Sequence, residues 1–144
     1  MTTPASTAGW QPPAGRHTIR KTFGFSAAHH LITVPEGHKC ARPHGHNWAV
    51  EVELGTAELV GPGWVTDFGD LAPLGAYIDA HLDHRDLNEA LPSGLEPTAE
   101  NLAAFLAHWC LRHLEPHVHG RLEAVTVSEG VKASATFRPA REHR

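Results

Sequence analysis

The sequence predicts an α+β fold in which a four-stranded antiparallel sheet carries two helices on one face. Apolar residues alternate with polar residues in two segments near each end of the chain, and they recur every three or four residues in two segments between them. The predicted order is therefore strand, strand, helix, helix, strand, strand. Each helix has a single apolar stripe, which is typical of helices that cover one face of an antiparallel sheet.

Alternation of apolar and polar side chains defines the four strands. The last two strands form a hairpin through Gly130. The segment WVTDF, at residues 64–68, is expected to be a short further strand or the end of one. A sheet of this size has open edges whose unpaired backbone groups can pair with another copy of the chain, so we expect an oligomer. The predicted strands span residues 18–27, 44–54, 121–129 and 132–138.

The two predicted helices begin at residues that are good N-caps. Asp67 or Asp70 caps the first helix, which reaches about Leu82 and tolerates Pro73 only in its first turn. Thr98 caps the second helix. The apolar stripe of the first helix consists of Leu71, Leu74, Ile78 and Leu82, and that of the second consists of Leu102, Phe105, Leu106, Trp109 and Cys110. Cys110 is therefore expected in the core.

Length and composition indicate an ordinary single-domain protein of 144 residues with a formal net charge of −4. No segment approaches the length of a membrane span, and the first residues lack the pattern of a secretory signal, so we expect a cytoplasmic protein without a membrane partner. The net charge does not favour nucleic acid, although Lys39, Arg42 and Arg85 are expected to cluster near the histidine motifs and could receive an anionic group. Two cysteines do not make a disulfide framework, so both are expected as thiols. The expected divisions are a flexible arm at 1–16, one domain at 17–140 and a tail at 141–144.

The stretch CARPHGHNWAVEVEL, at residues 40–54, places two histidines on an apolar strand face. His44 and His46 have the same parity as the apolar residues that follow, so their imidazoles converge if the strand runs unbroken through Gly45. Converging imidazoles that lack other partners are well satisfied by a divalent metal. His29 is the best third ligand, because it ends the first strand and a neighbouring antiparallel strand would bring it against the pair. Three imidazoles favour zinc and leave a fourth position open.

Several motifs occur together in an order that resembles a known family. They are FSAAHHL, VPEGHKCARPHGHNW, WVTDFGDL, LDHRDLNE, PTAENLA and VSEG, and they lie within residues 23–137. Their order and spacing resemble the 6-pyruvoyl tetrahydropterin synthase family, and most closely its bacterial 6-carboxytetrahydropterin synthase branch. The element Cys-x3-His-Gly-His with an upstream Ala-Ala-His is the most specific of these signals.

The resemblance implies a tunnelling fold assembled as a hexamer of two trimers around a barrel, with sites between subunits. It implies that Cys40 is the general base, that Asp83 and His84 are its relay partners, and that Glu129 holds the pterin ring. Glu129 shares a strand face with valines, where a carboxylate could accept two parallel hydrogen bonds from the amino-pyrimidine edge of a pterin. The zinc ligands implied by the resemblance are His29, His44 and His46, and the further substrate-binding residues expected are Thr98, Lys39 and Arg42.

The implied reaction is a zinc-dependent lyase reaction. It converts 7,8-dihydroneopterin triphosphate to 6-carboxytetrahydropterin, acetaldehyde and triphosphate in queuosine or 7-deazapurine biosynthesis. Within the family, the mammalian-type pyruvoyl synthases have their cysteine two residues further from the His-Gly-His pair, whereas three residues separate Cys40 from His44 here. Family members usually have threonine where this chain has Gly130, which alters the expected contacts to the pterin.

Other interpretations remain open. Each functional residue alone has a simpler explanation: a satisfied core histidine, an incidental loop cysteine at position 40, a His84 that complements a helix C-terminus, or a strand-end glutamate at position 129. Among functions, the alternatives are a 6-pyruvoyl tetrahydropterin synthase, a zinc hydrolase and a non-catalytic zinc-binding subunit. The hydrolase is the weaker alternative because no HExxH helix accompanies the histidines.

Overall fold

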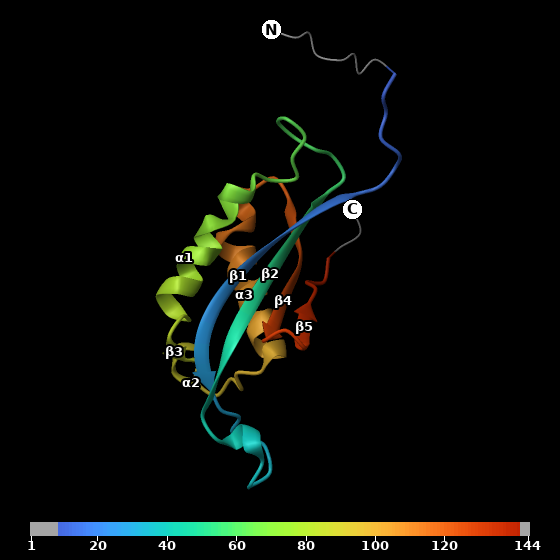
Figure 1. Cartoon of the computed structure of the whole chain (residues 1–144). Coiled ribbons are helices and arrows are strands. Elements are labelled where there is room, and N and C mark those ends of the chain that lie inside the picture. Colours follow the sequence, from blue (N-terminus) through green and yellow to red (C-terminus); the bar gives the residue numbers. More distant parts are fainter. Residues whose placement is uncertain (1–8, 142–144) are drawn as a thin grey trace.

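The structure is a computed structural model that describes residues 9–141, and its sheet carries helices on one face (Figure 1). The first eight residues of the predicted arm and residues 142–144 of the predicted tail lie outside the described residues. The strands are β1 (His17–His29), β2 (His44–Thr56), β3 (Arg85–Asp86), β4 (Arg121–Glu129) and β5 (Ala133–Phe137). The helices are α1 (Ala72–His81), α2 (Leu87–Ala90) and α3 (Ala99–His113), with 3-10 turns η1 (Lys39–Ala41), η2 (Phe68–Leu71) and η3 (Glu115–His117).

The sheet has five strands in the order β3-β1-β2-β4-β5 and is mixed, so the predicted four-stranded antiparallel sheet is wrong in strand number. The four predicted strands are present and pair antiparallel. The additional strand, β3, runs parallel to the end of β1 and pairs with Ala27 and Ala28. Two residues are too few to display alternation, which is why the sequence does not reveal β3. The segment at 64–68 is not a strand, because Trp64 makes only an isolated bridge to Val60.

The two predicted helices are confirmed as α1 and α3, and α2 is a third helix of only four residues. Pro73 lies in the first turn of α1, where its missing N–H costs no intrahelical hydrogen bond. Asp67 caps the 3-10 turn that leads into α1, because its side chain accepts a hydrogen bond from the N–H of Gly69. Thr98 caps α3 as predicted, by accepting from the N–H of Asn101 at 3.1 Å.

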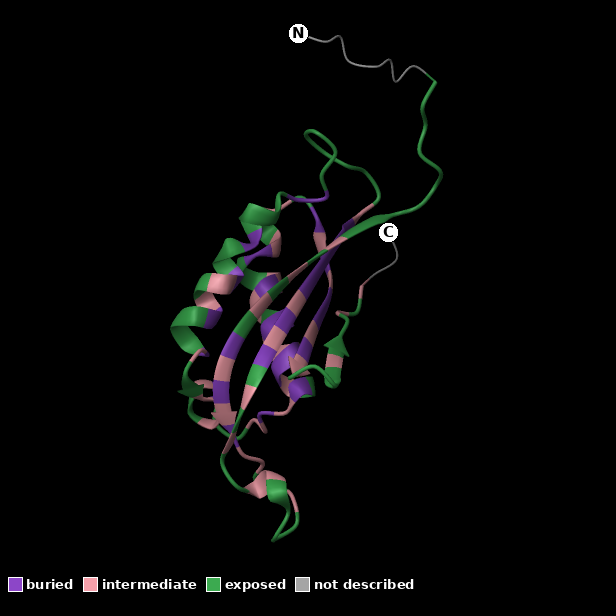
Figure 2. Cartoon of the chain, in the orientation of Figure 1, coloured by how far each residue is buried: buried purple, intermediate pink, exposed green. Residues whose placement is uncertain are grey.

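The core lies between the helices and the apolar face of the sheet. Figure 2 shows buried positions alternating with less buried ones along β1 and β2, which is the pattern of a sheet with one covered face. Trp48, Val50 and Val52 are buried from β2, and Leu106 and Cys110 are buried from α3. The prediction that Cys110 is a core residue is therefore confirmed.

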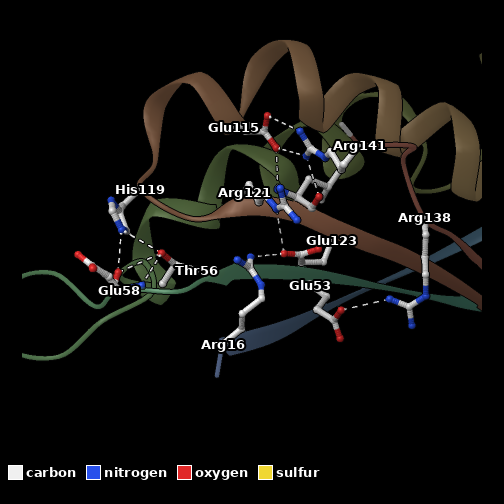
Figure 3. A network of polar contacts seen from close by, with 11 residues as sticks. Arg16, Glu53, Thr56, Glu58, Glu115, His119, Arg121, Glu123, Arg138 and Arg141 are labelled. Carbon is white, nitrogen blue, oxygen red and sulfur yellow. Dashed lines mark hydrogen bonds and ion pairs between the residues drawn. The ribbon is translucent and has the colours of Figure 1, made fainter. Parts of the chain in front are cut away.

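Charged residues near both ends of the described chain form ion pairs with the sheet and the turn η3 (Figure 3). Arg16 pairs with Glu123 at 2.6 Å, and Arg138 pairs with Glu53 at 3.4 Å. Arg141, the first residue of the predicted tail, pairs with Glu115. These contacts hold residues next to the termini against the sheet, and they contribute nothing to the site described below. None of the described helices combines the length and the apolar character that a membrane span requires.

Candidate active site

Three imidazoles converge where β1 ends and β2 begins. The antiparallel register places His29 directly opposite His44, and it places His46 opposite Ala27. The ring centroids are 4.6 Å apart for His29 and His44, 5.0 Å for His29 and His46, and 4.9 Å for His44 and His46. The convergence predicted from strand alternation is therefore present. Trp48, whose indole N–H donates to the Ala27 carbonyl at 3.1 Å, contacts the rings of His29 and His46 edge-on.

Hydrogen bonds to backbone carbonyls orient two of the rings. Nδ1 of His29 lies 2.8 Å from the carbonyl oxygen of Pro97, and Nδ1 of His44 lies 2.7 Å from that of Arg42. A carbonyl can only accept, so each Nδ1 carries the hydrogen and each Nε2 keeps a free lone pair. Burial is the main reason why the pKa of His29 is below its usual value, which keeps this ring neutral at physiological pH.

The three rings fit a divalent metal ion. One ring nitrogen from each histidine lies within 4.8 Å of the others. The Nε2 atoms of His29 and His46 are buried and have no hydrogen-bond partner among the described residues. A buried polar atom without a partner is costly, and coordination to a metal would satisfy both. Neutral imidazoles with Nδ1–H groups bonded to carbonyls are the usual ligands of zinc sites with an open position.

A cavity of about 840 Å³ opens beside the three histidines. It brings together side chains from the loop before β2, from the start of α3 and from the end of β4. The predicted site residues that line it are Cys40, Lys39, Arg42, Thr98, Glu129, His29, His44 and His46. Leu31, Ala99 and Glu100 also line this cavity, and they were not among the predicted site residues. Glu100 lies two residues after the Thr98 cap. This place at the start of the helix is the sequence signal that could have identified it as a residue lining the cavity.

Cys40 is held on a short structured turn. The turn η1 is capped by His38, whose Nδ1 accepts from the N–H of Cys40 at 3.0 Å. The carbonyl of Cys40 accepts from the N–H of Leu31 at 2.7 Å, which joins the two ends of the loop. Cys40 is half-buried, whereas Cys110 is fully buried and burial raises the pKa of its thiol to about 12. Of the two thiols, only that of Cys40 lines the cavity.

Glu129 ends β4 and lies near the three histidines. It lies opposite Trp48 in the sheet, and its Oε2 is 3.7 Å from Nε2 of His46. A second hollow of about 440 Å³ adjoins the first and runs from Glu129 along β5. Gly130 adopts a positive φ of 72° after Glu129, a conformation that glycine tolerates best, and it starts the turn to β5. The glycine at this position therefore has a backbone role.

Asp83 and His84 are not in this cavity. Oδ2 of Asp83 lies 2.9 Å from Nδ1 of His84, and Oδ1 accepts from the N–H of Ser26 at 2.9 Å. The pKa of the Asp83 carboxyl is below its usual value, mainly because of the hydrogen bond from the Ser26 N–H and next because of the one from His84. The His84 side chain is 81% exposed and borders a separate hollow of about 600 Å³, which it shares with His46 and Arg85. One chain alone does not bring this pair to Cys40.

Arg85 also lies apart from the other two basic residues of the predicted cluster. Its guanidinium donates to the Ala80 carbonyl at 3.0 Å, at the end of α1. Lys39 and Arg42 are exposed and line the cavity with the histidines. The predicted cluster of three basic residues is therefore wrong with respect to Arg85, which pairs with the end of β1 and borders the hollow of His46 and His84 instead.

Comparisons with known proteins place the fold and the motifs in one family. The model of the 6-pyruvoyl tetrahydropterin synthase family matches residues 18–140, so the chain belongs to this family. It is 41% identical over 78 residues to a protein of Archaeoglobus fulgidus that carries 6-carboxy-5,6,7,8-tetrahydropterin synthase as a provisional name. It is 39% identical over 71 residues to a Halobacterium salinarum protein with a similar name. These matches cover 54% and 49% of this chain but only 62% and 40% of the relatives.

Solved structures support the same fold. The 6-pyruvoyl tetrahydropterin synthase of Caenorhabditis elegans superimposes with a TM-score of 0.76 at 25% identity, over 88% of this chain and 98% of that one. The Plasmodium vivax enzyme of the same name gives 0.66 at 19% identity, over 87% of this chain and 98% of that one. The arrangement of sheet and helices is therefore shared, while identity this low carries only the fold for the second structure.

Proposed function

We propose that this chain is a zinc-dependent 6-carboxytetrahydropterin synthase. It would convert 7,8-dihydroneopterin triphosphate and water to 6-carboxy-5,6,7,8-tetrahydropterin, acetaldehyde and triphosphate, in queuosine or 7-deazapurine biosynthesis. One observation carries the proposal: three converging imidazoles, a thiol and a carboxylate line one cavity. The names of the two archaeal relatives support the carboxy product.

His29, His44 and His46 would hold the metal. Zinc supplies Lewis-acid polarisation of the hydroxyls on the substrate side chain, which makes protons there easier to remove. The bonds from His29 to Pro97 and from His44 to Arg42 keep each ring in the tautomer that leaves Nε2 free. The chain's own contribution here is orientation, because both rings are fixed before substrate arrives.

The other lining residues have complementary roles in this proposal. Cys40 acts as the base that removes and returns protons on the substrate side chain. Glu129 accepts hydrogen bonds from the amino-pyrimidine edge of the pterin, which would lie in the hollow along β5. Lys39 and Arg42 are exposed at the rim and suit the triphosphate, and Thr98 contacts the substrate from the start of α3.

Asp83 and His84 would act from a neighbouring copy. Within one chain, His84 borders a separate hollow that it shares with His46, and neither His84 nor Asp83 lines the cavity of Cys40. A homohexamer with sites between subunits, as the family resemblance implies, would let this pair serve the thiol of an adjacent chain. The exposed His84 ring, already hydrogen-bonded to Asp83, is suited to that role.

The nearest alternative is a 6-pyruvoyl tetrahydropterin synthase, which is the activity that gives both the family and the C. elegans protein their names. The short tether between Cys40 and His44 favours the carboxy product. It includes Pro43, whose ring fixes φ and restricts where the thiol can lie. A base displaced along the side chain would meet a different carbon and thus favour carbon–carbon cleavage. A non-catalytic zinc-binding subunit would need the histidines but not Cys40 and Glu129 together.

The test is to incubate the purified protein with dihydroneopterin triphosphate, trap volatile aldehyde and follow the pterin by mass spectrometry. The proposal predicts one acetaldehyde and one carboxypterin for each substrate consumed. A pyruvoyl product without aldehyde would assign the sister activity. No conversion by zinc-loaded protein would contradict both synthase activities and favour the non-catalytic alternative.

A further inference from the structure

The loop that carries Cys40 is attached to the rest of the molecule at the exit of β1. Four successive backbone N–H groups there each donate to a defined acceptor, although this part of the loop is neither helix nor strand. They are His30 to Oδ1 of Asn88 at 2.9 Å, Leu31 to the Cys40 carbonyl at 2.7 Å, Ile32 to Oε1 of Glu96 at 2.7 Å, and Thr33 to Oε2 of Glu96 at 3.0 Å. Two side chains from later in the sequence therefore fix where this loop begins.

Glu96 supplies most of this attachment. Its carboxylate accepts the N–H groups of Ile32 and Thr33, and its Oε2 also accepts the Thr33 hydroxyl at 2.9 Å. Ile32 is 62% exposed, so burial of apolar surface does not hold this segment. The pKa of the Glu96 carboxyl is lowered, mainly by the hydrogen bond from the Ile32 N–H and next by the one from the Thr33 N–H. The carboxyl is therefore ionised at neutral pH and accepts all three hydrogen bonds.

The same short segment also orients a metal ligand. Pro97, the next residue, accepts from Nδ1 of His29, and Thr98 caps α3. Asn101, in the first turn of α3, donates from its side chain to the Glu96 carbonyl at 3.0 Å. Glu96 is thus fixed to α3 through its backbone and to the cysteine loop through its carboxylate. Moving residues 32 and 33 away from Glu96 would therefore break the hydrogen bonds that join this loop to the segment orienting His29.

We propose that Glu96 is a positioning residue, which holds the loop bearing Cys40 in register with His29. The link runs from the Glu96 carboxylate to residues 32–33, and from the adjoining Leu31 N–H to the Cys40 carbonyl. Glu96 does not line the cavity, so it acts through the loop and not on the substrate. The inference rests on the proposed function only in that it takes Cys40 as the base.

The test is Glu96→Gln, which keeps the shape of the side chain but replaces one acceptor oxygen with an NH₂ group that faces an N–H. Hydrogen exchange by mass spectrometry should show the amides of Ile32 and Thr33 exchanging at least about tenfold faster, because the Glu96 side chain that accepts from both is weakened as an acceptor. The kcat should fall roughly 10- to 100-fold, since a displacement of about 1 Å has that effect, with KM changed less than about twofold and zinc content unchanged.

The matched control is Glu89→Gln, at an exposed glutamate on α2 outside this cluster. It should leave both exchange and turnover unchanged. Exchange at residues 32 and 33 in Glu96→Gln that equals the control, or faster exchange with normal kcat, would overturn the proposal. If the unaltered protein has no pterin activity, the proposed function fails, and the exchange result alone still decides whether Glu96 holds the loop.

Should the variant fail to fold, the unaltered protein provides the decisive comparison. Amides 31–33 should exchange more slowly than those of residues 36, 37 and 39, which lie in the same exposed loop. These three residues have no backbone N–H donor bond among those described for the loop. Equal exchange along the whole loop would contradict the attachment.

Discussion

His29 has a different neighbour at each ring nitrogen, and this division explains the geometry of the site. Its Nδ1 donates to the carbonyl of Pro97, while its Nε2 is buried without a partner beside His44 and His46. The residue is 3% exposed, so little solvent reaches it. A buried site that keeps an imidazole neutral and leaves one lone pair free favours a metal over a proton.

Replacement of Cys40 separates the base from the metal. Cys40→Ala should retain zinc and assembly, because the side chain is not among the three ligand imidazoles. Turnover should fall about 100- to 10,000-fold, the usual contribution of a general base. A Cys110→Ala variant is the matched control, since that thiol is buried in the core and touches no part of the cavity. Near-normal turnover in Cys40→Ala would show that the thiol is an ordinary loop residue.

At the residue level, the sequence predicts the convergence of the histidines because strand alternation is strictly local. His44 and His46 need only an unbroken strand to share a face, and the antiparallel neighbour then supplies His29. Asp83 and His84 could not be placed in the same way. Their position depends on β3 pairing with the end of β1 and on the left-handed conformation of His84, with φ at 57°, and neither leaves a pattern in the sequence.

At the level of elements, length decides which ones the sequence reveals. The strands β1 and β2 have 13 residues each and α3 has 15, and all three were predicted from periodicity. The strand β3 and the helix α2 have two and four residues and were missed. These short elements nevertheless have a structural role, because Asn88 of α2 pairs with both backbone groups of His30.

The α3 helix links the core to the site. Its buried face packs on β4 and β5, while its N-terminus places Thr98 and Glu100 at the cavity. The segment directly before it supplies the Pro97 carbonyl to His29 and the Glu96 carboxylate to the cysteine loop. A helix predicted from its apolar stripe and its cap therefore also fixes residues whose roles the sequence did not reveal.

The sheet as a whole leaves two edges open within the described chain. The short strand β3 pairs with only a small part of β1, so the rest of that edge of β1 has no strand partner among the described residues. The outer edge of β5 has none either. Unpaired edges favour pairing with another copy. The family resemblance implies six copies, and we predict a hexamer with a mass by light scattering of about 94 kDa, six times the 15.6 kDa chain. A stable, active monomer would contradict a site shared between subunits.

The zinc content of the protein tests the central claim most directly. If three imidazoles form the metal site, purified protein should contain about one zinc per chain, and His46→Ala should lose most of it, because a three-ligand site cannot spare one ligand. His30→Ala is the matched control, since His30 is next to His29 in sequence but outside the ligand group, and it should retain full zinc. Full zinc in His46→Ala, with the same fold by circular dichroism, would contradict the ligand set.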